Sequence, residues 1–162
     1  MTTAEPVEIL LIEDDPEDLD LALQALAAEN ICNRIQVARD GEEALDFLFR
    51  RGVHKDIPER QPALILLDLK LPKVDGLEVL DQIKRDPKLR FVPVVILTSS
   101  LQERDLVRGY RLGVNSYIQK PVDFDQFRAT IKQLGYYWLL VNQRIPAGIY
   151  QEENANEAAS QR

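Results

Sequence analysis

The sequence predicts an α/β fold in which five parallel strands form one sheet with helices on both faces. Five short, largely apolar segments alternate with segments whose apolar residues recur at helical spacing. Apolar strands joined by crossover helices are typical of a parallel sheet that is covered on both sides. The chain of 162 residues is long enough to form one such domain with a proper core.

The five expected strands are short runs that end abruptly in polar residues. They cover residues 7–12, 34–38, 63–67, 93–97 and 115–118. The first run is largely apolar and the fourth is continuously apolar, which favours burial on both faces, whereas the second alternates between apolar and polar residues. Each run is shorter than an ordinary helix, so the strand interpretation is preferred.

The five expected helices carry apolar stripes and recognisable ends. They cover residues 16–30, 41–51, 76–86, 102–112 and about 124–139. Asp15 and Asp40 are natural N-caps, Pro16 suits a first helical turn, and Gly113 suits the position just after a helix. The polar stretch 52–62 contains two prolines and no periodicity, which predicts a loop.

Composition and charge limit the class of protein. We expect one domain over residues 5–141 and a polar, flexible tail over residues 142–162. The net charge of −7 argues against general binding to nucleic acid or anionic membrane, and the apolar runs are too short to span a bilayer. The single cysteine, Cys32, agrees with a reducing compartment and is interpreted as a packing residue. A cytoplasmic location is therefore expected.

Polar residues follow four different strands at the points where those strands end. Glu13 and Asp14 follow the first strand, Asp68 the third, Thr98 the fourth, and Lys120 follows the fifth. The carboxyl ends of parallel strands meet at one edge of the sheet, which is where such folds bind ligands. Taken singly, each residue is more simply a helix cap, a turn former or a surface charge. Their coincidence at one edge points to a functional site.

Three carboxylates in one cleft repel one another and therefore need a cation. Their hard oxygen ligands, without supporting histidine or cysteine, favour Mg²⁺ over zinc. Asp14, Asp68 and the backbone carbonyl of Lys70 would bind the ion directly, while Glu13 would act through water. An aspartate held beside Mg²⁺ is a plausible nucleophile toward phosphorus. Lys120 and Thr98 would then bind the phosphoryl oxygens.

These residues resemble the receiver domain of two-component response regulators. The resemblance covers residues 8–140 and rests on the acidic pair Glu13-Asp14 and on three motifs. The motifs are LILLDLKLPKVDG around Asp68, VVILTSS with Thr98, and SYIQKP with Lys120.

The resemblance implies a flavodoxin-like (βα)5 fold with strand order 2-1-3-4-5. It implies autocatalysed transfer of a phosphoryl group from a kinase phosphohistidine to Asp68, with Mg²⁺ required and no substrate turned over. It also implies that Thr98 and Tyr117 act together as a conformational switch. The Lys120–Pro121 peptide bond is expected to be cis on the same ground.

Finer features are similar to the single-domain regulators that partner phytochrome histidine kinases. The ending LGYYWLL is one such feature. The partners implied are a phytochrome-type sensor kinase and a downstream protein target or phosphotransfer protein. We expect a homodimer through the face made by the fourth helix, fifth strand and fifth helix, with Tyr136, Tyr137 and Trp138. Core packing of the same aromatic stretch is the rival interpretation.

Three alternative functions share parts of this pattern. An intermediate phosphate shuttle in a multistep relay uses the same acceptor residue. A Mg²⁺-dependent aspartyl phosphatase commonly carries its nucleophile in a DxD motif after the first strand, whereas Asp68 follows the third strand and its second neighbour is Lys70. A degenerate receiver would lack part of the acidic, threonine and lysine set. His54, the only histidine, lies in a polar loop and is expected to be solvated.

Overall fold

The computed structural model describes residues 7–28, 34–57 and 61–145 of the chain. Cys32 lies outside the described residues, as do residues 146–162 of the predicted tail. Among the described residues, no helix combines the length and the apolar character needed to cross a membrane.

Five parallel strands form a single sheet in the order β2-β1-β3-β4-β5. The strands are β1 Ile9–Ile12, β2 Ile35–Ala38, β3 Leu64–Leu67, β4 Val94–Thr98 and β5 Ser116–Gln119. The three central strands are completely buried, while β2 and β5 at the edges are mostly part-buried. The predicted fold class and strand order are confirmed.

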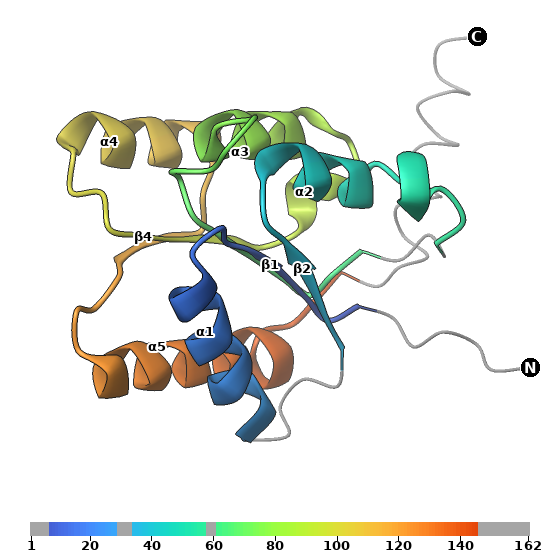
Figure 1. Cartoon of the computed structure of the whole chain (residues 1–162). Coiled ribbons are helices and arrows are strands. Elements are labelled where there is room, and N and C mark those ends of the chain that lie inside the picture. Colours follow the sequence, from blue (N-terminus) through green and yellow to red (C-terminus); the bar gives the residue numbers. More distant parts are fainter. Residues whose placement is uncertain (1–6, 29–33, 58–60, 146–162) are drawn as a thin grey trace, which may run out of the picture.

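Helices cover both faces of the sheet. They are α1 Pro16–Ala28, α2 Gly41–Leu48, α3 Gly76–Arg85, α4 Glu103–Leu112 and α5 Phe124–Tyr136. Helices α1 and α5 lie together on one face, and α2, α3 and α4 lie on the other (Figure 1). This arrangement leaves the carboxyl edge of the sheet open between the two helical layers.

Helix starts follow the acidic capping residues of the sequence. The Asp15 side chain accepts hydrogen bonds from the backbone N–H groups of Glu17 and Asp18, which are orphan donors of the first turn of α1. Asp40, Asp75 and Asp123 cap α2, α3 and α5 in the same way. These caps place four helix N-termini at the loops that leave the carboxyl edge.

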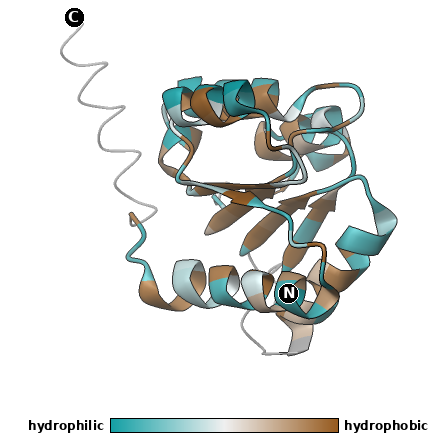
Figure 2. Cartoon of the chain, turned by 90° about the vertical axis from the view of Figure 1, so that its left-hand side faces the viewer, coloured by the Kyte–Doolittle hydropathy of each residue, from teal (hydrophilic) through white to brown (hydrophobic). Residues whose placement is uncertain are grey.

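Two apolar clusters form the core, one on each side of the sheet. One cluster joins alternate strand residues to α2, α3 and α4, and the other joins the remaining strand residues to α1 and α5. Figure 2 shows the hydrophobic strands lying between the two helical layers. Because the central strands are packed from both sides, their ends are held firmly, and so are the side chains that follow them.

Several local features differ from the sequence-based expectation. The loop after α2 contains a short 3₁₀ turn, η1 Gly52–His54, and a second turn, η2 Leu89–Phe91, precedes β4. The His54 ring is part-buried and packs edge-on against Phe47 at 5.3 Å between ring centroids, so the expectation of a solvated His54 is wrong in part. Apolar contact, which periodicity does not predict in a loop, explains this difference.

The last helix continues into a π-helical turn, η3 Tyr137–Val141. Trp138 and Leu139 pack against the core cluster on the α1 and α5 side, whereas Tyr136, Tyr137, Leu140 and Val141 are exposed. The stretch therefore divides between core packing and exposed apolar surface. Just beyond it, Arg144 forms an ion pair of 2.7 Å with Glu8, which joins the end of the described chain to the start of β1.

Candidate functional site

The ends of four strands bring the predicted site residues to one edge of the sheet. Glu13 and Asp14 follow β1, and Asp68 follows β3, where its backbone N–H donates to the Ile12 carbonyl. Thr98 is the last residue of β4, and its carbonyl accepts a hydrogen bond of 2.8 Å from the backbone N–H of Lys120. These two backbone hydrogen bonds continue the parallel sheet by one residue beyond β3 and β5, at Asp68 and Lys120.

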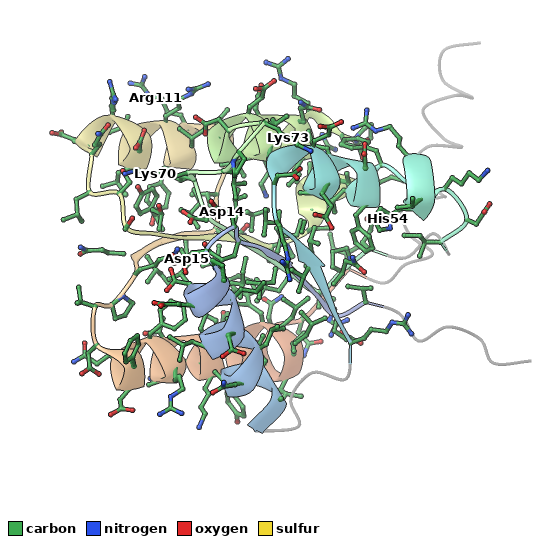
Figure 3. The ribbon with its side chains drawn as sticks, viewed as in Figure 1. Asp14, Asp15, His54, Lys70, Lys73 and Arg111 are labelled. Atoms are coloured by element: carbon green, nitrogen blue, oxygen red, sulfur yellow. The ribbon has the colours of Figure 1, made fainter. Side chains whose placement is uncertain are left out.

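The acidic cluster consists of Glu13, Asp14 and Asp68. One carboxylate oxygen of each lies within 4.8 Å of the other two. Glu13 is 5% exposed and Asp68 is 7% exposed, whereas Asp14 faces the solvent. Figure 3 shows Asp14 and Asp15 at the start of α1, with Lys70 on the loop that follows β3. The cluster therefore combines two buried carboxylates with one that faces the solvent.

Lys120 places a positive charge beside this acidic cluster. Its Nζ lies 2.8 Å from Glu13 Oε2, 2.8 Å from Asp18 Oδ2 and 3.0 Å from Asp68 Oδ2. The side chain is only 10% exposed, so its ammonium group is held among acceptors rather than in bulk water. Three hydrogen-bond donors meet three carboxylates, which matches the full donor capacity of an ammonium group.

Asp18 is a site residue that the sequence interpretation missed. It lies in the first turn of α1, where acidic residues are common because they favour the positive end of the helix dipole. The available signal was positional: α1 begins at the same sheet edge as Lys120, and Asp18 follows the N-cap by three residues.

Burial shifts the protonation equilibria of the cluster. Burial first, and then the charge of Asp68, raise the pKa of Glu13 to about 7, although Lys120 and the Asp15 N–H act in the opposite direction. Burial alone would lower the pKa of Lys120, but the bonds to Asp18 and Glu13 outweigh it and raise that pKa. The ammonium is therefore charged at any ordinary pH, while Glu13 is poised near neutrality.

The donor set fits a hard divalent cation. All three side chains of the cluster offer carboxylate oxygens, which Mg²⁺ and Mn²⁺ prefer over nitrogen or sulfur. Burial is the main cause of the raised pKa of Glu13, and the charge of Asp68 adds to it; a bound cation would favour the ionised form of Glu13. Lys70 donates its backbone N–H weakly, at 3.4 Å, to Asp68 Oδ1, so its main chain is close to the cluster. Its carbonyl stays a predicted ligand.

Thr98 and Tyr117 lie beside this cluster in a network of hydrogen bonds centred on Ser100. Thr98 is fully buried, and its hydroxyl accepts from the Ser100 N–H at 3.3 Å. The Tyr117 hydroxyl donates to the Ser100 carbonyl at 3.1 Å, and the Ser100 hydroxyl donates to Asp105 of α4 at 2.7 Å. The strand end, the β5 aromatic and the start of α4 are thus joined through one residue.

The Lys120–Pro121 peptide bond is not cis. Among the residues that the structure describes, no peptide bond is cis, so this expectation is wrong for the present structure. The trans form is the ordinary preference of an X–Pro bond, by about 0.5–1 kcal/mol. Lys120 reaches all three carboxylates in this form.

Comparison with known proteins agrees with this geometry. Residues 9–132 match the family described as the response regulator receiver domain. Response regulator Rcp1 of Synechocystis sp. is 40% identical over 134 residues, which cover 83% of this chain and 90% of Rcp1. The probable methanogenesis regulatory protein FilR2 of Methanothrix harundinacea is 44% identical over 135 residues, which cover 83% of this chain and 85% of FilR2.

Solved structures of response regulators are also similar to this chain. The Mn²⁺-bound form of Rcp1 and the phosphorylated cyanobacterial phytochrome response regulator RcpA each have a TM-score of 0.81 and 38% identity, and each is fully covered. They cover 87% and 88% of this chain, respectively. The bacteriophytochrome response regulator AtBRR has 54% identity and a TM-score of 0.68, covering 86% of this chain and 99% of its own. The chain therefore belongs to the response regulator receiver domain family and is homologous to phytochrome response regulators.

Proposed function

We propose that the protein is a single-domain response regulator that accepts a phosphoryl group on Asp68. The observation that carries this proposal is the contact between the Lys120 ammonium and Asp68 Oδ2, at 3.0 Å, next to the two further carboxylates of the acidic cluster. A nucleophilic carboxylate, a fixed cation and a set of metal ligands are the groups that phosphoryl transfer to an aspartate requires. Receiver domains as a family are phosphorylated by sensor histidine kinases and are generally not enzymes.

In the proposed step, an Asp68 carboxylate oxygen attacks the phosphorus of a phosphohistidine and the phosphorus–nitrogen bond breaks. The electron pair leaves with the imidazole, and an acyl phosphate remains on Asp68. A Mg²⁺ ion held by Asp14, Asp68 and the Lys70 carbonyl, with Glu13 acting through water, would offset charge on the transferring group. Lys120 and the Thr98 hydroxyl bind phosphoryl oxygens, and Tyr117 responds to the movement of Thr98.

The kinase partner is proposed to be of the phytochrome type. This rests on the likeness to regulators that are described as phytochrome or bacteriophytochrome response regulators. The output is proposed to be contact with a protein target or a phosphotransfer protein. A homodimer through α4, β5 and α5 is supported by exposed apolar side chains on α4 and η3, including Val107, Tyr110 and Tyr137.

The test is phosphoryl uptake measured by intact mass. The protein is incubated with Mg²⁺ and acetyl phosphate or a phosphorylated histidine kinase, and its oligomeric state is measured by light scattering alongside. We expect a gain of one phosphoryl group in the wild type and none in Asp68→Asn. Asp81→Asn on α3 makes the same charge change at the ion pair with Arg85, and it should behave as wild type.

Other outcomes would contradict the proposal. Uptake in Asp68→Asn equal to that of the wild type would place the acceptor elsewhere. Continuous release of phosphate from a small ester would indicate a phosphatase, and an absence of uptake in the wild type would indicate a receiver that does not use phosphorylation. A monomer at all concentrations, with and without phosphoryl donor, would contradict the homodimer.

A further inference from the structure

Lys120 receives its three carboxylate partners from three different elements. Glu13 follows β1, Asp68 follows β3, and Asp18 is on α1. The bond to Asp18 is as short as the bond to Glu13, at 2.8 Å. An ammonium on a four-carbon stem is mobile unless its donors are fixed, because its ordering loses considerable rotamer entropy. Three partners from three directions fix it.

Asp18 differs from the other two partners in its relation to the acidic cluster. Glu13 and Asp68 belong to the group of carboxylates whose oxygens lie within 4.8 Å of one another, and Asp18 does not. A divalent cation bound in that cluster would therefore compete with Lys120 for Glu13 and Asp68 and weaken their attraction to its ammonium group. The Asp18 carboxylate would keep its full charge and its bond to Lys120.

The alternative for Asp18 is a purely local role at the start of α1. Its backbone N–H donates to the Asp15 cap, but its carboxylate accepts a hydrogen bond from the Lys120 ammonium. The Asp18 side chain is only 29% exposed, whereas its neighbours Asp15 and Glu17 are exposed to solvent. A helix-dipole role needs no such inward contact, since an exposed acid in the first turn serves equally well.

We propose that Asp18 is a positioning residue that holds the Lys120 ammonium beside Asp68 while a cation and the incoming phosphoryl group compete for the other two carboxylates. The inference rests on the proposed function of Asp68 as phosphoryl acceptor. Asp18 does not touch the phosphoryl group; it acts through Lys120, which donates to a phosphoryl oxygen as the transfer proceeds.

The first test compares phosphorylation rates of Asp18→Ala, Asp18→Asn and the matched control Asp20→Asn, with Mg²⁺ and acetyl phosphate. Asp20 is on the same helix and contacts Gln24, so the control removes one charge from α1 without touching Lys120. We expect Asp18→Ala to lose about tenfold in rate, since a charge-assisted hydrogen bond is removed. Asp18→Asn keeps an acceptor oxygen and should lose only about threefold.

The second test measures the position of Lys120 without relying on phosphorylation. Lysine acetylation by a water-soluble reagent is followed by peptide mass spectrometry in the presence of Mg²⁺. Lys120 should be labelled several-fold faster in Asp18→Ala than in the wild type, because its ammonium is released toward solvent. Lys73, whose side chain is 61% exposed, is an internal control and should react equally in both.

The outcomes separate this inference from the function on which it rests. If the wild type takes up phosphoryl groups but Asp18→Ala matches it in rate and in Lys120 labelling, Asp18 does not position Lys120 and the inference fails alone. Equal acceleration by Asp18→Ala and Asp18→Asn would assign Asp18 a simple repulsive charge and overturn the inference as well. If the wild type takes up none, the proposed function and the inference fail together.

Discussion

The two halves of the sheet edge are built from different kinds of interaction. The charged half consists of Glu13, Asp14, Asp68, Lys120 and Asp18, in which one ammonium contacts three carboxylates. The hydroxyl half consists of Thr98, Ser100, Tyr117 and Asp105, joined by hydrogen bonds of 2.7–3.3 Å. Both halves begin at strand ends, and the Lys120–Thr98 backbone bond joins them.

This difference assigns the halves different roles. The charged half is a partly buried group of side chains with more negative than positive charge, so a cation that binds there stabilises the fold. The hydroxyl half makes a hydrogen bond at each of its polar side chains, so it changes only if an existing bond is exchanged for another. The charged half is suited to binding, and the hydroxyl half is suited to passing a change on to α4.

The largest expected effect comes from removing the cation of the charged half. Lys120→Met removes the one ammonium that Glu13 and Asp68 share and leaves them, among the described residues, only backbone donors, so we expect a loss of about 3–5 kcal/mol in the free energy of unfolding at pH 8 with a chelator present. Added Mg²⁺ should recover part of that loss, because a bound cation stabilises the folded state by mass action. Urea denaturation at several Mg²⁺ concentrations measures both quantities.

Thr98→Val is the matched change in the hydroxyl half. It removes the acceptor of the Ser100 N–H, and we expect a loss of about 1–3 kcal/mol that does not depend on Mg²⁺. If both variants respond to Mg²⁺ to the same extent, the division of the edge into two electrostatically distinct halves is wrong.

The second prediction concerns the pH dependence of stability without metal. The pKa of Glu13 is raised from 4.5 to about 7, so the folded state favours protonated Glu13 more than the unfolded state does. The resulting stabilisation is fully present below about pH 4.5 and is lost as the pH rises through about 7. The total change is about 3–4 kcal/mol, since one pKa unit corresponds to about 1.4 kcal/mol.

Glu13→Gln isolates this contribution, because glutamine resembles protonated glutamate and does not titrate. The difference in unfolding free energy between wild type and Glu13→Gln should grow from pH 5 to pH 8 in chelator, with the wild type becoming the less stable of the two. Mg²⁺ should flatten the trend, because a cation favours ionised Glu13. A constant difference across this range would show that Glu13 titrates normally in the folded protein.

The charged half was largely predictable from the sequence. In the hydroxyl half, Thr98 was predicted from its place at a strand end and Tyr117 from the family resemblance, but the hydrogen bonds that join them through Ser100 and Asp105 were not. Apolar strands ending in Glu13, Asp14 and Asp68 place those side chains at one edge once the sheet is parallel, because parallel topology aligns carboxyl ends. Asp18 was missed because an acid in a first helical turn has a simpler explanation. The bonds of Ser100 depend on the path of an irregular loop, which leaves no periodic pattern in a sequence.

The smallest predicted effect comes from two glycines, one packed against the backbone of the charged half and one packed against side chains next to the hydroxyl half. A Cβ at Gly76, the first residue of α3, would lie 2.4 Å from the Asp68 carbonyl oxygen and 2.6 Å from Leu69 Cα, both of which are backbone atoms. A Cβ at Gly109 in α4 would lie 3.2 Å from the end of the Ile96 side chain, which can move. The backbone of residues 68 and 69, which faces Gly76, cannot move without displacing Asp68.

We therefore expect Gly76→Ala to lower the free energy of unfolding by about 1–3 kcal/mol and to reduce phosphoryl uptake where the variant is still folded. Gly109→Ala should change stability by about 1 kcal/mol or less, because the gain in helix propensity offsets the crowding. Urea denaturation and intact mass on the same samples measure the pair. Equal losses in both variants would mean that the backbone at Asp68 adjusts to an added methyl group as readily as the side chains next to Gly109 do. In that case the charged half would be held by its ion pairs rather than by the backbone that carries it.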